Sequence, residues 1–242
     1  MTAEPPRATR VDIVLPCYNE VGVLRQTVET LIEFAAAHLD YDWRVVIAEN
    51  GSTDGTAELA EQLASEDQRV IARTSRQKGR GLALKRVWMQ SEADIVCYMD
   101  VDLSTDIAHL PDLLRLVSDG RCDVAIGSRL ARGAATRRSL KREITSRGYV
   151  FLIRATFPRM KLTDAQCGFK ALNRKVIEQV VPLVENPMWF FDTELLVLAH
   201  RKGFRICELP VRWIEDRDTK VRIVDTALED IRGLLRMRFK RI

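Results

Sequence analysis

Short apolar runs of strand length alternate along the chain with longer stretches whose apolar residues recur at helical spacing. The apolar runs are VDIVL (11–15), RVVIA (44–48), RVIAR (69–73), DIVCYM (94–99) and DVAIG (123–127), and the helical stretches cover 21–37, 54–66, 78–90 and 107–118. This alternation is typical of right-handed β-α-β units, which build a mostly parallel sheet flanked by helices. The pattern therefore predicts an α/β fold.

Polar residues follow each predicted strand at the point where the strand ends. The five exits read PCYNE (16–20), ENGSTDGT (49–56), SRQKGRG (75–81), DVD (100–102) and GSR (127–129). In parallel α/β sheets, ligands bind beyond the carboxyl ends of the strands. A purely structural protein does not need polar residues after five strands at the same sheet edge, so the pattern favours a ligand site there.

The DVD exit places Asp100 and Asp102 directly after an apolar run. Neighbouring carboxylates repel each other, and burying them without a counter-charge is costly. Hard divalent cations such as Mg²⁺ or Mn²⁺ prefer carboxylate and phosphate oxygens. We therefore expect both residues to hold a divalent cation. A role as helix N-cap acid fits Asp106 instead, because Asp106 precedes the helix predicted over 107–118.

Length and composition describe a single globular domain. The chain has 242 residues, of which 46% are hydrophobic and 30% are charged, as in an ordinary α/β domain. The first ten residues look like a flexible lead without a signal-peptide core. The sequence has no run of the roughly 18 apolar residues that a membrane span requires, so we expect a cytosolic location. Its five cysteines form no C-x-x-C pair, which favours reduced core thiols over disulfides or a zinc site.

Basic residues are concentrated in two segments, although the net charge is only +4. Residues 129–147 contain seven Arg or Lys against one acid, and residues 232–242 contain five against none. Two basic patches imply an anionic partner. The alternative is that they are solvated helix faces.

Further motifs follow the five exits, namely KREITSRG (141–148), TDAQCGFK (163–170), WFFDTELL (189–196) and ELPVRWIEDRDTK (208–220). Together with PCYNE, ENGSTDGT, DVD and GSR, they make the chain resemble family 2 glycosyltransferases with the GT-A fold, in particular the subgroup that makes dolichyl- or polyprenyl-phosphate sugars. The resemblance implies a GT-A domain over 11–221, and the residues themselves indicate a flexible lead over 1–10 and an amphipathic basic C-terminal helix over 222–242. The resemblance also implies an inverting transfer of a hexose from a nucleotide sugar to a lipid phosphate, with Mg²⁺ or Mn²⁺ as cofactor.

The same resemblance implies which residues bind the nucleotide and the metal. The nucleotide set is Pro16, Tyr18, Glu20, Glu49, Lys78 and Asp100, and the metal ligands are Asp100 and Asp102. The sequence departs from the family pattern at two of these places. Glu49-Asn50 stands where relatives commonly carry Asp-Asp, and Ser104 stands where many carry Gln. Whether Ser104 or water completes the metal shell is left open.

The expected acceptor needs cations more than it needs a base. A lipid phosphate has a second pKa of about 6 and is already largely ionised at neutral pH, so no general base is obligatory. Cations and hydrogen-bond donors must instead bring two anions close together. By resemblance, the catalytic set is Asp102, Arg129, Arg142, Ser146, Arg217 and Lys220. Asp164 and Asp192 are expected near the site, where a loop hydrogen-bonding role for Asp164 is the alternative to a catalytic one.

Several alternatives remain open at this stage. The later motifs are more similar to dolichyl-phosphate glucosyltransferases than to mannosyl enzymes, which favours UDP-glucose over GDP-mannose without settling the donor. A family 2 enzyme acting on a saccharide hydroxyl is one rival. A sugar-nucleotide pyrophosphorylase would be expected to follow its first strand with a Gly-rich loop, where this chain has PCYNE. A non-catalytic sugar-nucleotide sensor would not need both carboxylates and all the acceptor-side residues.

Residues 222–242 predict an amphipathic helix with a basic end. Its apolar residues at helical spacing are Val224, Ala227, Leu228, Ile231, Leu234 and Leu235, and its basic residues are Arg232, Arg236, Arg238, Lys240 and Arg241. The apolar stripe either packs on the core of the protein or lies in a membrane surface. Because the acceptor is a lipid, we expect a peripheral position at the cytoplasmic membrane face. The expected partners are the membrane surface or an integral membrane protein, and not nucleic acid. Deleting 236–242 would then release the protein from anionic vesicles.

Overall fold

The structure is a computed structural model, and it describes residues 7–137, 139–214 and 223–240. Its centre is a seven-stranded sheet in the order β3-β2-β1-β4-β7-β5-β8. The strands are β1 (Arg10–Cys17), β2 (Asp42–Glu49), β3 (Val70–Arg73), β4 (Ile95–Met99), β5 (Val124–Ser128), β7 (Phe169–Asn173) and β8 (Ile206–Pro210). The five predicted strands correspond to β1 to β5, so the predicted α/β fold is confirmed.

One strand breaks the parallel arrangement. β7 lies between β4 and β5 and runs antiparallel to both, whereas the other neighbouring strands of this sheet pair in parallel. A second, two-stranded parallel sheet joins β6 (Ala135–Arg137) to β9 (Arg212–Ile214). The prediction of a mostly parallel sheet is therefore confirmed, and β7 is the exception that the alternating pattern did not predict.

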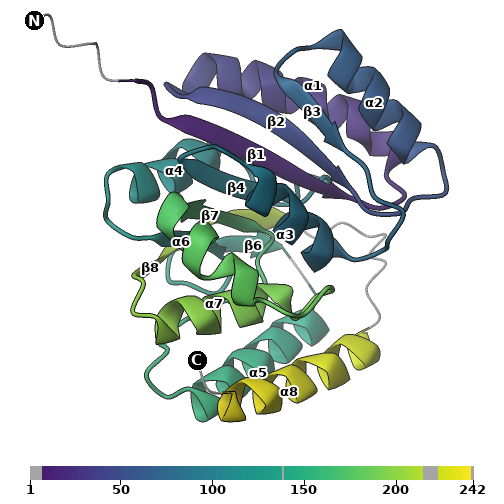
Figure 1. Ribbon diagram of the computed structural model, residues 1–242. Helices are drawn as coiled ribbons and strands as arrows, with labels where there is room; N and C mark the ends of the chain where they lie inside the picture. The colour runs from purple at the N-terminus through teal and green to yellow at the C-terminus, as the bar shows by residue number, and fades with distance from the viewer. Residues whose placement is uncertain (1–6, 138, 215–222, 241–242) are drawn as a thin grey trace, which may run out of the picture.

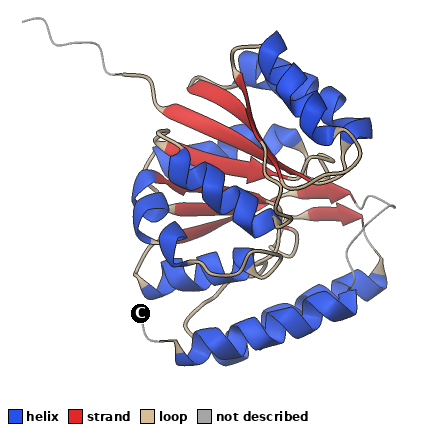
Figure 2. Cartoon of the chain, turned by 45° about the vertical axis from the view of Figure 1, so that its right-hand side comes forward, coloured by secondary structure: helices blue, strands red, loops and turns tan. Residues whose placement is uncertain are grey.

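Helices cover both faces of the large sheet (Figures 1 and 2). One apolar core joins the sheet to α1 (Val21–His38), α2 (Thr56–Glu66) and α4 (Leu110–Ser118), which follows a short 3-10 turn, η1 (Ile107–His109). The other core joins the opposite face to α3 (Arg80–Gln90), α6 (Arg174–Gln179), the 3-10 turn η2 (Val181–Leu183) and α7 (Phe191–Arg201). The four helical stretches predicted from the sequence correspond to α1, α2, α3 and η1 with α4.

Two long helices lie beyond α7, at the lower edge of Figure 1: α5 (Leu140–Thr156) and α8 (Ile223–Phe239). They contact each other, and α8 also contacts α7. Leu234 and Met237 of α8 are buried in the core of that face. Gly233 lies against the Phe190 ring, where a Cβ would come within 2.5 Å of a ring carbon. The C-terminal helix therefore packs on the domain through one side.

Candidate active site

The exits of β1, β2 and β3 are tied together by two side chains that follow each other in the sequence. Glu49 ends β2 and is buried, and its carboxylate accepts hydrogen bonds from the amides of Ser52 and Ser75. Asn50 donates to the carbonyl of Cys17 at 2.7 Å and accepts from the amide of Gly79 at 3.2 Å. Glu49, a member of the expected nucleotide set, thus also holds the loops around it in place.

The other residues of the expected nucleotide set lie on the same edge. Lys78 places its ammonium 3.8 Å from the centre of the Tyr18 ring, a distance at which a cation is attracted to an aromatic face. Pro16 is buried within β1, and the Glu20 amide donates to the hydroxyl of Thr56 at 2.9 Å. The structure therefore brings residues from the first three exits to one place, around the end of β1.

The DVD segment forms a tight turn after β4. Leu103 has a φ of 51°, which is uncommon for a residue with a side chain and costs energy that the surroundings must supply. The Thr27 hydroxyl donates to the carbonyl of Val101 at 2.6 Å, and the Ile214 amide donates to the carbonyl of Ser104 at 2.9 Å. Contacts from α1 and β9 thus hold this turn.

Two carboxylates of the turn, Asp100 and Asp102, reach the surface. Asp102 is exposed and accepts from the Ser104 amide at 2.9 Å, and the Asp100 side chain is 38% exposed. Among the described residues, no group of three or more His, Cys, Asp or Glu side chains could hold a metal ion. Mg²⁺ commonly binds to one or two carboxylates together with substrate phosphates and water. The pair therefore fits a cation that arrives with a diphosphate rather than one held by protein ligands alone.

Arg80 connects Asp100 to a buried carboxylate on α7. One terminal nitrogen of Arg80 lies 2.9 Å from Asp100 Oδ1, and the other lies 2.8 Å from Asp192 Oδ2. The Arg80 side chain is only 12% exposed and the Asp192 side chain 3%. In a buried setting, such charge-assisted hydrogen bonds fix the position of both partners. Asp100 is thus held by a cation that is itself anchored in the core.

Lys170 supplies the second cation of this network. It lies in β7 and is fully buried, with its ammonium 2.8 Å from Asp192 Oδ1, 2.6 Å from the Cys167 carbonyl and 3.1 Å from the Tyr98 hydroxyl. The Tyr98 hydroxyl in turn donates to Asp192. Burial alone would raise the pKa of the Asp192 carboxyl, but Lys170 and Arg80 hold that pKa below its ordinary value. Asp192 is therefore an ionised structural anion with little basicity.

A second ion pair lies at the GSR exit. Arg129 donates two hydrogen bonds to Asp164, from Nε to Oδ2 at 2.7 Å and from Nη2 to Oδ1 at 3.0 Å. Its guanidinium lies 5.5 Å from the centre of the Trp213 ring. Burial would raise the pKa of the Asp164 carboxyl, but Arg129 lowers it below its ordinary value. Asp164 therefore makes hydrogen bonds within the loop, and the choice between the loop role and a catalytic role stays a prediction. A guanidinium carries five N–H donors, so Arg129 keeps donor capacity for a further anion.

The remaining acceptor-side residues are only partly described. Arg142 and Ser146 lie in the first half of α5, and Ser146 is half-buried. The Arg142 side chain, Arg217 and Lys220 lie outside the described residues, so their expected roles stay predictions. One turn after Ser146, Tyr149 meets the hydroxyl of Thr193 at 2.7 Å. Thr193 follows Asp192, so α5 is joined to the helix that carries the buried anion.

Three members of the buried network, Arg80, Lys170 and Tyr98, were not among the predicted site residues. A lysine inside the apolar run FKALN was a signal that could have been used, because buried lysines are almost always paired. Tyr98 and Arg80 had no comparable signal, since each needs a partner from a distant part of the chain.

A mostly parallel sheet with a carboxylate pair and a cluster of cations at its carboxyl edge is suited to an enzyme that binds a diphosphate. Comparison with known proteins gives the family. The model for glycosyl transferase family 2 matches residues 12–181, and the chain belongs to this family.

Curated relatives extend the comparison over most of the chain. It is 42% identical to the glycosyltransferase AglD of Haloferax volcanii over 226 residues, which are 93% of this chain and 35% of AglD. The chain thus spans about a third of that protein. It is 28% identical to the dolichyl-phosphate β-glucosyltransferase of Saccharomyces cerevisiae, over 94% of this chain and 74% of the yeast protein.

A solved structure shares the fold. Glucosyl-3-phosphoglycerate synthase from Mycobacterium tuberculosis, in complex with Mn²⁺, UDP and phosphoglyceric acid, superposes with a TM-score of 0.70 at 18% identity. The match covers 97% of this chain and 80% of the mycobacterial one. This likeness supports the α/β architecture flanked by helices, whereas the family assignment rests on the sequence.

Proposed function

We propose that this protein is an inverting glycosyltransferase that moves a hexose from a nucleotide sugar to dolichyl or polyprenyl phosphate. The observation that carries the proposal is the pairing of two buried carboxylates near the DVD turn. Asp192 and Asp164 are each ion-paired, and their cationic partners hold both pKa values low. A saccharide hydroxyl needs a base to remove its proton, whereas a phosphate acceptor is already ionised.

In the proposed reaction, a phosphate oxygen of the acceptor attacks the anomeric carbon of the donor. A new carbon–oxygen bond forms there, and the bond to the diphosphate breaks with its electron pair remaining on the diphosphate. Asp100 and Asp102 would hold Mg²⁺ or Mn²⁺. When bound, this cation would neutralise charge on the leaving diphosphate. Attack from the opposite side inverts the anomeric carbon.

The proposed roles divide the site into two halves. The nucleotide half consists of Pro16, Tyr18, Glu20, Glu49, Lys78 and Asp100. In the acceptor half, Arg129 offers its remaining N–H donors to the lipid phosphate, together with Arg142, Ser146, Arg217 and Lys220. These cations let two anions approach each other without repulsion.

The names of the relatives support the choice of acceptor. Dolichyl-phosphate β-glucosyltransferases from Saccharomyces cerevisiae and other eukaryotes match over most of this chain. Their names favour a glucosyl donor, so we propose UDP-glucose, with GDP-mannose as the alternative. Among the described residues, none of the helices has the length and apolar character needed to cross a bilayer. Since the tail of the acceptor stays in the membrane, we propose that the protein works as a peripheral enzyme at the cytoplasmic membrane face.

A donor panel tests this function. UDP-glucose, GDP-mannose, UDP-galactose and UDP-N-acetylglucosamine would each be incubated with a water-soluble, short-chain polyprenyl phosphate and Mg²⁺ or Mn²⁺. We expect a β-linked sugar phosphate from UDP-glucose or GDP-mannose. Transfer to a saccharide hydroxyl, and not to the phosphate, would support the rival acceptor. Nucleotide binding without any transfer would support the non-catalytic sensor.

A further inference from the structure

Exposed large apolar side chains are concentrated on α5 and α8. On α5, Ile144 is 71% exposed and Phe151 is 70% exposed, and on α8, Phe239 is 80% exposed. We define the outer face as these three residues together with four more exposed ones: Leu152 on α5, and Leu228, Ile231 and Leu235 on α8. The two helices contact each other, and exposed apolar side chains gathered on neighbouring helices are typical of a site of interaction with a protein or a membrane.

Packing within the domain does not account for the outer face. α8 already buries a separate side, formed by Asp230, Leu234 and Met237. Leu228 lies about two turns before Leu235, and Leu235 lies about one turn before Phe239. This spacing places all three exposed residues along the opposite side of the helix. The sequence left open whether the apolar stripe of this helix packs on the core or faces outward. In the structure, Leu234 packs on the core, whereas Leu228, Ile231 and Leu235 face outward. The side chains of Val224 and Ala227 lie outside the description.

Basic residues border the outer face. Arg232 is exposed and lies one turn from both Leu228 and Leu235, and Arg238 is exposed one turn beyond Leu235. On α5, Arg147 is 66% exposed and also pairs with Glu143 at 2.5 Å, so the arginines of α8 carry most of the basic border. A second copy of this chain would bring the same arginines to the contact, so repulsion opposes self-association. An anionic lipid surface would instead attract them and accept the apolar side chains between them.

Two other basic residues of α8 form ion pairs within the protein. Arg236 pairs with Glu185 and Glu194, both at 2.8 Å, and Lys240 pairs with Glu185 at 2.8 Å. These contacts fasten the end of α8 to the segment before and within α7. Deleting residues 236–242, as the sequence suggested, would therefore remove internal contacts as well as surface charge, and it cannot isolate a membrane contact.

The inner sides of both helices reach the active site. Tyr149 of α5 meets Thr193, the neighbour of Asp192. Asp230 of α8 accepts a hydrogen bond from Gln166 at 2.9 Å. Gln166 lies two residues before Gly168, whose carbonyl accepts from the Asp100 amide at 3.1 Å. A bilayer on the outer face would thus lie one helix layer from the DVD turn.

We propose that the outer face of α5 and α8 rests on an anionic membrane surface, with Phe151 and Phe239 inserted at the headgroup level. The proposal rests on the proposed lipid acceptor, and it adds the orientation in which the domain would meet the bilayer. A helix that lies in the plane of the interface binds to vesicles through its apolar side chains and the basic residues beside them. Its binding strengthens with the buried apolar area and with the anionic lipid content.

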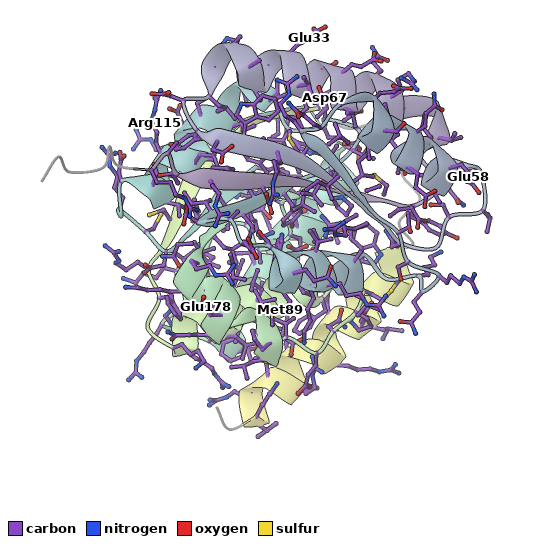
Figure 3. All side chains as sticks on the ribbon, turned by 45° about the horizontal axis from the view of Figure 1, so that its top comes forward. Glu33, Glu58, Asp67, Met89, Arg115 and Glu178 are labelled. Atoms are coloured by element: carbon purple, nitrogen blue, oxygen red, sulfur yellow. The ribbon has the colours of Figure 1, made fainter. Side chains whose placement is uncertain are left out.

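Vesicle co-sedimentation of the full chain tests the surface directly. Vesicles of phosphatidylcholine with phosphatidylglycerol would be compared with vesicles of phosphatidylcholine alone. We expect binding to the anionic vesicles, and a loss of about tenfold or more in partitioning for the double variant Phe151→Glu/Phe239→Glu. The matched control is Met89→Glu on α3, because Met89 is 46% exposed and lies outside the outer face (Figure 3). The control should bind like the original protein.

Three results would overturn the proposal. The first is equal vesicle binding by the double variant and the original protein, and the second is no binding by the original protein at low salt. The third is a dimer in the absence of vesicles that the double variant converts to a monomer, since the outer face would then be a contact between copies. Activity on the short-chain acceptor separates this proposal from the proposed function. The double variant should keep that activity and lose transfer to acceptor embedded in vesicles, whereas vesicle binding without any transfer would overturn only the function.

Discussion

Gly168 lies so close to Asp100 that a Cβ on Gly168 would come within 1.8 Å of Asp100 Oδ2. The contact arises because β7 runs antiparallel to β4, with Phe169 opposite Met99. The residue before β7 therefore meets the residue after β4. Only a hydrogen atom fits between this backbone and the carboxylate, so the position of Asp100 depends on the absence of a side chain at residue 168.

Gly168→Ala should therefore displace Asp100 and lower kcat by about 100-fold, because a shift of about 1 Å in a catalytic group commonly costs that much. Steady-state kinetics with the short-chain acceptor would measure the effect. Gly148→Ala is the control, since a Cβ there meets no heavy atom within 4 Å. Near-normal kinetics in Gly168→Ala would show that Asp100 does not need this position.

Asp102→Asn should reduce activity by about 100-fold or more, since the change keeps the shape of the side chain and removes the charge that would anchor a cation. Initial rates across a Mg²⁺ and Mn²⁺ titration would test this. Full turnover of the unmodified protein in excess chelator would refute the role of a divalent cation.

Alanine at Arg142 or Arg217 should weaken use of the lipid phosphate more than binding of the nucleotide, because we assign both to the acceptor half. The test compares the apparent KM for the short-chain acceptor with the Kd for the nucleotide. Loss of nucleotide affinity with an unchanged acceptor KM would contradict this assignment and place both residues in the nucleotide half.

Lys170→Met should lower the free energy of unfolding by about 3 kcal/mol, because Asp192 would lose a buried counter-charge. The double variant Lys170→Met/Asp192→Asn should lose less than the sum of the two single variants, since neither charge then remains without its partner. Urea unfolding gives these values. Arg115→Met is the control, because Arg115 forms an exposed pair with Asp112 that should contribute little (Figure 3). Simple additivity would contradict the coupling.

Asp230 should make stability depend on pH near neutrality. Burial is the main cause that raises the pKa of this carboxyl, and nearby Glu229 and Asp192 also raise it. Hydrogen bonds from Gln166 and Tyr149 oppose the rise, and the resulting pKa is about 7. The folded protein thus binds a proton that the unfolded chain releases near pH 4. The stabilisation linked to this proton is fully present below about pH 4 and is lost as pH rises to about 7.

Asp230→Asn should consequently raise the free energy of unfolding at pH 8 by about 1 to 3 kcal/mol, because an amide can accept from Gln166 without carrying a buried charge. The difference from the original protein should shrink as pH falls towards 4. Urea unfolding at several pH values measures it. A constant difference across this range would mean that Asp230 does not titrate there.

Local pattern was enough to predict the parallel part of the fold. The runs 11–15, 44–48 and 94–99 became neighbouring strands because each is apolar, of strand length and followed by a helix. The strand β7 was not predicted, because FKALN contains a lysine and its partners lie some 70 residues earlier, in β4, and 45 residues earlier, in β5.

The candidate site was predictable where the chemistry is local. Asp100 and Asp102 could be predicted as candidate cation ligands because both follow an apolar run with one residue between them. The pairing of Asp192 with Lys170 and Arg80 depends on three separate elements that only the folded chain brings together. The effect of this pairing on the basicity of Asp192, on which the proposed class of acceptor rests, could not be predicted from any one of those segments.

The reversed strand β7 has a consequence for how such a site can change. Because β7 starts where its neighbours end, the segment 163–168 reaches the ligand edge without following any of the parallel strands. Substitutions there can alter what Asp164 and Gln166 contact while the loops that carry Tyr18 and Glu49 keep their own hydrogen bonds. We therefore expect residues 163–167 to be exchangeable in chimeras with a relative of different acceptor preference, provided that Gly168, which fixes the position of Asp100, is kept.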